Sequence, residues 1–176
     1  TTLGTEEGSD IWGWTDPLDG KEYAIVGTTN STAFVDVSDP INPIFLGRIE
    51  TANGNTSSWR DVKVYNNHAY IVADGVGNHG MQVFDLTNLR TGPNPDLTYT
   101  STVNDGEVIV FSGDNGINIG SCHNVVINED DATAYLVGCN AVSGGPIFVD
   151  ISDPTAPTIS GSYAASGYTH DAQVIT

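Results

Sequence analysis

Three of the four histidines stand in sequence settings that suit ligand binding. His79 lies in the glycine-rich stretch DGVGNHG, His123 follows a cysteine in SCHN, and His170 directly precedes Asp171. Imidazole nitrogens suit Zn, Cu, Fe or Ni, whereas carboxylate, amide and carbonyl oxygens suit Ca. No HExxH motif or other close ligand pair occurs, so these side chains can form one centre only if the fold brings them together.

The two cysteines frame a predicted β-hairpin. Apolar runs at 125–127 and 134–137 flank the polar turn 128–131, a pattern typical of two antiparallel strands. If Ile127 pairs with Ala134, counting outward sets Cys122 opposite Cys139, where Cβ atoms lie close enough for a disulfide after modest adjustment. The sequence therefore predicts a Cys122–Cys139 disulfide formed in an oxidising compartment, and the alternative is a pair of buried free thiols.

Composition excludes several classes of function. The chain of 176 residues has 22 acidic and 5 basic residues and a net charge of −17. Nucleic-acid binding needs Lys and Arg to neutralise phosphates, so this class is disfavoured, as is adsorption to anionic membranes. No apolar run is long enough for a transmembrane helix. Abundant Gly, Thr, Ser and Asn are typical of loop-rich, secreted all-β proteins.

A repeat organises the chain and must position these residues. EYAIVG (22–27), HAYIVAD (68–74) and TAYLVGC (133–139) are versions of one strand. Each is followed by a second shared strand, in AFVDVSDP, MQVFDLTNL and IFVDISDP. Repeats of this length with several short strands indicate propeller blades, and no helical period occurs. We expect an all-β fold, a β-propeller of four-stranded antiparallel blades with about three blades present, as a partial propeller or fragment.

The repeat divides the chain into five parts. We expect an N-terminal segment at 1–8, blades at 9–56, 57–119 and 120–167, and the first strand of a further blade at 168–176, with an insertion at 91–119 in the second blade. The aspartates that end the third strand of each blade stand before a turn. We therefore expect Asp36, Asp85 and Asp150 to cap turns rather than to act as catalytic acids.

Blade topology places the candidate residues on one face. In a propeller, the loop that enters the inner strand and the loop between the second and third strands open on the same side. The sequence thus predicts a metal site from His79, His123, His170 and Asp171, and ligand-binding candidates at Arg60, Asp61, His79, Asn124 and Asp171. The alternative is that these His/Arg–Asp/Asn pairs are repeat-defining residues that hydrogen-bond neighbouring blades.

The motifs together resemble a known family. YAIVGTTNSTAFVDVSDPINPIFLG, SSWRDVKVYNNHAYIVADG, GNHGMQVFDLTNLR, SCHNVVINED and YTHDAQV are similar to LVIVD-repeat proteins, the choice-of-anchor B family of bacterial and archaeal cell-surface proteins. The resemblance runs from about Ser9 to the end. It implies a secreted or surface-anchored propeller and no settled enzymatic activity. Propellers have four to eight blades, so other chains or the remainder of the propeller must supply the rest.

Two classes of function follow from this pattern. The favoured one is a secreted or cell-surface propeller that acts as a non-enzymatic interaction or structural module, with calcium or a transition metal as the candidate cofactor. The alternative is a metal-dependent hydrolase or oxidoreductase with a His/Asp centre at the propeller mouth, although no GxSxG, Walker or Rossmann motif occurs. Trp12, Trp14 and Trp59 could stack on a surface glycan or wedge between blades.

Overall fold

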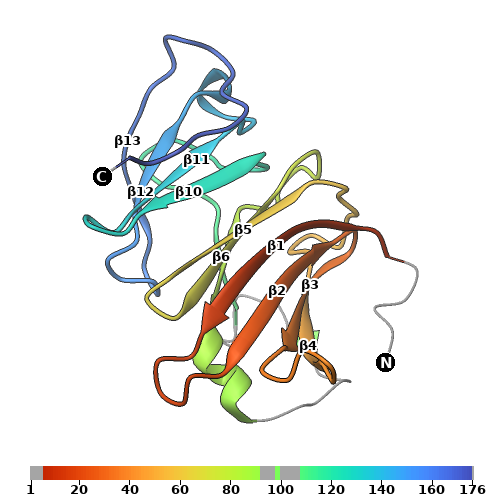
Figure 1. Cartoon of the computed structure of the whole chain (residues 1–176). Coiled ribbons are helices and arrows are strands. Elements are labelled where there is room, and N and C mark those ends of the chain that lie inside the picture. Colours follow the sequence, from red (N-terminus) through yellow and green to blue (C-terminus); the bar gives the residue numbers. More distant parts are fainter. Residues whose placement is uncertain (1–5, 92–97, 100–107, 176) are drawn as a thin grey trace.

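Three β-sheets follow one another along the chain. The computed structural model describes residues 6–91, 98–99 and 108–175, and Figure 1 shows the sheets side by side in chain order, from red and orange through yellow to blue. The predicted segment 1–8 and the insertion at 91–119 fall partly outside the described residues. The all-β, partial-propeller architecture of three four-stranded antiparallel sheets predicted from the repeat is confirmed. The predicted division at 9–56, 57–119 and 120–167 stays a prediction.

The first sheet has the strand order expected of a blade. It contains β1 (Gly8–Thr15), β2 (Glu22–Thr28), β3 (Ser31–Asp36) and β4 (Ile44–Glu50), each antiparallel to the next. A fifth, two-residue strand, β8 (Thr98–Tyr99), runs parallel to β4. The fourth strand follows the Asp-Pro-x-x-Pro segment at 39–43. Proline cannot donate to a β-ladder, so this segment forms the turn before the outer strand.

The second sheet repeats this order around an insertion. β5 (Arg60–Tyr65), β6 (His68–Ala73), β7 (Met81–Asp85) and β9 (Val108–Phe111) are antiparallel neighbours, and the 3-10 helix η1 (Leu86–Thr91) follows β7. Asn66 and Asn67, both with positive φ (47° and 59°), join β5 to β6. Two such residues form the tight hairpin turn that suits the twist of the strands.

The third sheet contains the predicted hairpin. β10 (Asn124–Asn128), β11 (Thr133–Val137), β12 (Ile147–Asp150) and β13 (Thr158–Ser162) form it, with the short 3-10 helix η2 (Val142–Gly144) between β11 and β12. Residues 168–175 form no strand, although the sequence predicts that 168–176 begins a further blade. An inner strand needs a hydrogen-bonded neighbour, and no described residue pairs with this segment in a ladder.

Two apolar layers hold the sheets together. One lies between the first and second sheets and includes Ile25, Phe34, Val62, Ile71 and Phe84. The other lies between the second and third sheets and includes Tyr70, Val72, Val125, Leu136 and Ile147. Alternate residues of β6, in the second sheet, point to opposite faces of that sheet. The second sheet therefore contributes to both layers. Among the described residues, no helix is both long and apolar enough to cross a membrane.

The inner strands β1, β5 and β10 contact one another in sequence order. The aspartates at the ends of the third strands cap turns as predicted. Asp36, Asp85 and Asp150 each accept the backbone N–H two residues on, at 2.9 Å.

Candidate functional site

The disulfide fixes one end of the candidate site. Ile127 pairs with Ala134, as predicted, and Cys122 and Cys139 are bonded with an S–S distance of 2.05 Å. Both cysteines are buried. The His123 N–H donates to Val137 O at 3.1 Å, which extends the ladder beyond β10. The backbone of His123 is therefore held on both sides, by the covalent bond at the preceding residue and by the strand that follows.

A carboxylate from the second sheet orients His123. Its Nδ1 lies 3.0 Å from Oδ2 of Asp74, the residue after β6. The His123 side chain is 17% exposed and that of Asp74 is 27% exposed, so the pair is partly screened from water. With Nδ1 donating to the carboxylate, the other ring nitrogen, Nε2, is left as a lone-pair donor.

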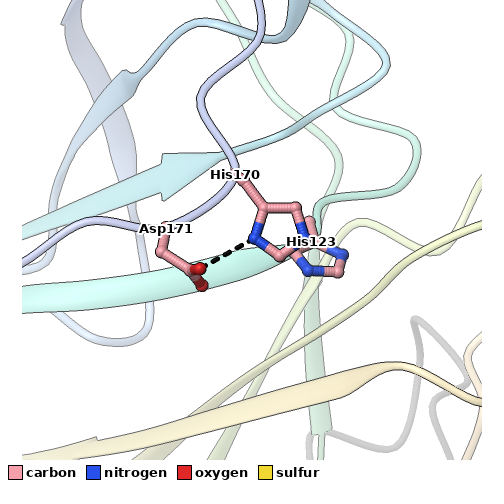
Figure 2. A group of neighbouring side chains, drawn as sticks. All are labelled: His123, His170 and Asp171. Carbon is pink, nitrogen blue, oxygen red and sulfur yellow. Dashed lines mark hydrogen bonds and ion pairs between the residues drawn. The ribbon is translucent and has the colours of Figure 1, made fainter.

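The C-terminal segment brings a second histidine to the first. The Thr169 N–H donates to Gly144 O at 3.0 Å. Gly138 and Gly144 leave room for the Tyr168 side chain, since a Cβ at either position would lie 2.9 Å or less from one of its atoms. These contacts place the His170 ring with its centroid 4.1 Å from that of His123. His170 Nδ1 lies 2.7 Å from Asp171 Oδ2 (Figure 2).

Three of the four predicted metal ligands thus lie together. One ligand atom from each of His123, His170 and Asp171 lies within 4.8 Å of the other two. His170 and Asp171 are exposed, at 64% and 71% of their side chains. His79 is not part of this group. The arrangement offers two imidazole nitrogens and a carboxylate oxygen, which is a donor set for a divalent transition metal.

His79 lies buried beside Arg60 instead. Its Nε2 lies 3.4 Å from Arg60 Nη1, and its Nδ1 donates to Gly80 O at 2.8 Å. Burial, together with the Arg60 cation, lowers the pKa of His79 to about 4, although the hydrogen bond to Gly80 opposes the change; the ring is therefore neutral and accepts from the guanidinium. Arg60 also donates to Thr28 O (2.8 Å) and Thr51 Oγ1 (2.6 Å) of the first sheet. Arg60 thus connects loops of neighbouring blades, and His79 supports its guanidinium from within the second blade.

Asp61 links consecutive inner strands. Its Oδ2 accepts the Val125 N–H at 2.7 Å, just as Asp10 Oδ2 in the first sheet accepts the Val62 N–H at 3.0 Å. Burial raises the pKa of Asp61 to about 6, as does its neighbour Asp10, while Lys63 opposes the change. Asn124 holds the same place in the third blade, and its buried Oδ1 has no hydrogen-bond partner among the residues that the structure describes. In the first two blades the residue at this position, Asp10 or Asp61, accepts a hydrogen bond from the inner strand of the next blade.

Two partners of the site were missed by the sequence analysis. Asp74, which orients His123, belongs to the repeat segment HAYIVAD, and its place after β6 beside the next inner strand is the signal that could have found it. Asn140 Oδ1 accepts the N–H groups of Gly120 (2.9 Å) and Ser121 (3.2 Å) and so fixes the backbone of the two residues before Cys122. Nothing in the spacing of Asn140 indicates this role.

Comparison with known families shows to which family the chain belongs. The sequence model of the LVIVD repeat matches residues 20–51, 57–89 and 141–165, which together make up just over half of the chain. The chain belongs to the LVIVD-repeat family. The first two LVIVD matches span β2–β4 and β5–β7, and the third spans β12 and β13. No curated protein matches the sequence at a significant level.

Within this LVIVD-repeat chain the candidate residues fall into two groups. Arg60 and Asp61 hydrogen-bond neighbouring blades, and His79 is buried against Arg60. His123, His170 and Asp171 form the second group. His123 lies just before β10 and is partly buried, whereas His170 and Asp171 lie in the segment after the third sheet and are exposed. The chain is a repeat-based structural and interaction module, and the second group is where ligand chemistry can occur.

Proposed function

We propose that this LVIVD-repeat chain is an extracellular interaction module whose two end faces bind further blades of the same kind. The N-terminal end face consists of Ile11, Ala24, Val26 and Val35. The C-terminal end face consists of the partly exposed Val126, Tyr135 and Phe148.

The observation that carries the proposal is the exposure of Ile11. In the three blades, the pairs Ile11–Val26, Val62–Ile71 and Val125–Leu136 occupy the same register position between the first two strands. The second and third pairs are fully buried against the preceding blade. Ile11 is 61% exposed, although its position in the repeat is one that a preceding blade covers.

The C-terminal end face has the complementary property. Ile25–Phe34 in the first blade and Tyr70–Val83 in the second are buried against the following blade. The equivalent pair, Tyr135–Phe148, is only half-buried. It lines a groove of about 370 Å³ whose other wall is formed by residues 172–175. An apolar face of this kind on a repeat protein is a stacking surface, since terminal repeats need a polar cap to end an array.

Asn124 Oδ1, which accepts from none of the described residues, supports the same conclusion at the inner edge. Asp10 and Asp61 each accept a backbone N–H from the next inner strand. A buried acceptor without a donor costs free energy, so a further inner strand that donates to Asn124 would remove this cost. The disulfide and the net charge of −17 support an extracellular setting, because disulfides persist in oxidising compartments.

Light scattering after size-exclusion chromatography tests the proposal. Because the two end faces are complementary, the chain is expected to self-associate head to tail as its concentration rises. Ile11→Asp removes an apolar contact worth about 1.5–3 kcal/mol on burial and adds a charge, so association should weaken at least about tenfold. Ile41→Asp is the matched control, because Ile41 is 85% exposed on a loop outside both faces.

Complementation sharpens the test. Val126→Asp blocks the C-terminal end face, and Ile11→Asp blocks the N-terminal one. Each variant alone should be monomeric, whereas their mixture should form a one-to-one dimer through the two intact faces. A wild-type chain that stays monomeric at all concentrations, or an Ile11→Asp variant that associates like the wild type, would overturn the proposal.

A metal-dependent enzyme stays the second candidate function. The observation in its favour is the group formed by His123, His170 and Asp171.

A further inference from the structure

Two Asp–His pairs meet at the boundary between the third blade and the segment that follows it. His123 Nδ1 contacts Asp74 Oδ2 at 3.0 Å, and His170 Nδ1 contacts Asp171 Oδ2 at 2.7 Å. A histidine that binds a metal through one ring nitrogen commonly donates the other N–H to a carboxylate, which fixes its tautomer and raises its basicity. His123 has this second partner in Asp74, whereas the carboxylate beside His170 belongs to Asp171, which is itself one of the candidate ligands. The two imidazole rings lie side by side (Figure 2).

The spacing is close to that of a metal centre. The three ligand atoms lie within 4.8 Å of one another. In a tetrahedral zinc centre with bonds of about 2.0–2.1 Å, ligand atoms lie about 3.3 Å apart. The group must therefore contract, and the exposed His170 and Asp171 side chains have the freedom to move inward. His123 provides the fixed reference, because the disulfide and Asp74 hold it.

The donor set selects the class of ion. Two imidazole nitrogens with one carboxylate oxygen suit Zn²⁺ and its transition-metal neighbours, whereas Ca²⁺ takes six to eight oxygen ligands. His170 and Asp171 are exposed, so the site is open to solvent on the side that the three protein ligands do not occupy. This is the coordination of a centre that keeps a position for water or a small ligand.

We infer that His123, His170 and Asp171 form a binding site for one Zn²⁺-class divalent metal ion, with Asp74 as a positioning residue for His123. This inference does not depend on the end-face proposal, because the ligands all belong to one chain and metal binding can be measured in a monomer. His79, buried beside Arg60, is outside the site.

Isothermal titration of the full chain with Zn²⁺, and with Co²⁺ followed by its visible absorption, tests the inference. We expect one Zn²⁺ per chain and, for Co²⁺, the intense absorption bands of four-coordinate geometry. His170→Ala should abolish this site and the bands. Since His170 is exposed, its removal should leave the far-UV circular dichroism unchanged. His68→Ala is the matched control, because His68 lies at the β5–β6 turn, and it should bind as the wild type does.

Asp74→Asn tests the positioning role. The amide preserves the size of the side chain but not the charge that orients His123, so Zn²⁺ affinity should fall about 10–100-fold, with the Co²⁺ bands shifted. Millimolar Ca²⁺ should not displace Zn²⁺. The inference is overturned if the wild type shows no saturable site, if His170→Ala binds unchanged, or if Ca²⁺ competes at equal concentration, which would indicate diffuse binding to the acidic surface.

Discussion

Burial determines the protonation of the polar side chains between the first two blades. Arg60 is 3% exposed and His79 fully buried, and desolvation lowers the pKa of Arg60 to about 10. The guanidinium stays charged, and the neutral imidazole accepts one of its hydrogen bonds. Arg60 stands at the start of an inner strand, a recurring position whose side chain could bind a ligand. Here it hydrogen-bonds the neighbouring blade instead.

The first prediction concerns the pH dependence of this pair. In the folded chain the pKa of His79 is about 4, below the ordinary value of 6.5, so its neutral form is favoured. The stability that this provides is complete above pH 6.5 and is lost as the pH falls towards 4. Asp61 acts in the opposite sense, because its raised pKa of about 6 makes its ionised form costly, a cost relieved as the pH falls from 6 to 4.

A His79→Gln variant separates the two effects. Gln keeps an acceptor for Arg60 but does not titrate. The free energy of unfolding of the wild type relative to this variant should fall by roughly 3 kcal/mol between pH 7 and pH 4, since each pKa unit corresponds to about 1.4 kcal/mol. Urea denaturation at the two pH values measures it. Parallel pH curves for the two proteins would show that His79 is not buried as a neutral ring.

At the scale of single elements, the hairpin β10–β11 was the most predictable part of the chain. Strand alternation and a short polar turn leave few registers, and the one with Ile127 opposite Ala134 also aligns the cysteines. The alternative of free thiols is excluded by the bond itself. The succession of the second and third strands in each blade was equally predictable, since both shared strand motifs and the aspartate turns recur in all three blades.

The site was only partly predictable, for a physical reason. His123, His170 and Asp171 lie near one another in the structure, as expected when the starts of successive inner strands are neighbours, but their role as ligands stays a prediction. Topology also predicted His79 there, but the turn at Gly80, whose φ is 73°, lies against the backbone of Phe111. His79 is buried below the surface as a result. Side-chain direction in a glycine-rich loop depends on such contacts, which repeat spacing does not encode.

Removal of the disulfide should loosen the third blade. The bond joins residues 17 apart in sequence, and closing a loop of this size stabilises a fold by about 3 kcal/mol in the chain-entropy model. A Cys122→Ala/Cys139→Ala variant should therefore unfold roughly 6–12 °C lower in a calorimetric scan. It should also bind Zn²⁺ more weakly, because His123 loses its anchor. Equal melting temperatures for variant and wild type would contradict the stabilising role.

At the scale of the three described blades, the stack lies between two partly exposed apolar faces. The repeat makes each blade complementary to the next, so the preceding side of the first blade and the following side of the third are equivalent to surfaces that are buried within the stack. The complementarity that lets blades stack within the chain thus also allows the two end faces to bind other blades. Heterologous contacts of this kind close into rings or continue as open arrays, depending on the rotation per blade.

The surface charge opposes this association, and that yields the final prediction. Two chains that each have a net charge of −17 repel one another, while the contact between their end faces is apolar. Salt shortens the Debye length from about 30 Å at 0.01 M to about 3 Å at 1 M, which removes the repulsion without weakening the apolar contact. Head-to-tail association should therefore strengthen as NaCl is raised, as measured by sedimentation equilibrium. Ile11→Asp should stay monomeric throughout, which excludes non-specific salting-out. Association that weakens with salt would instead assign the contact to ion pairs and reject the apolar end faces as its basis.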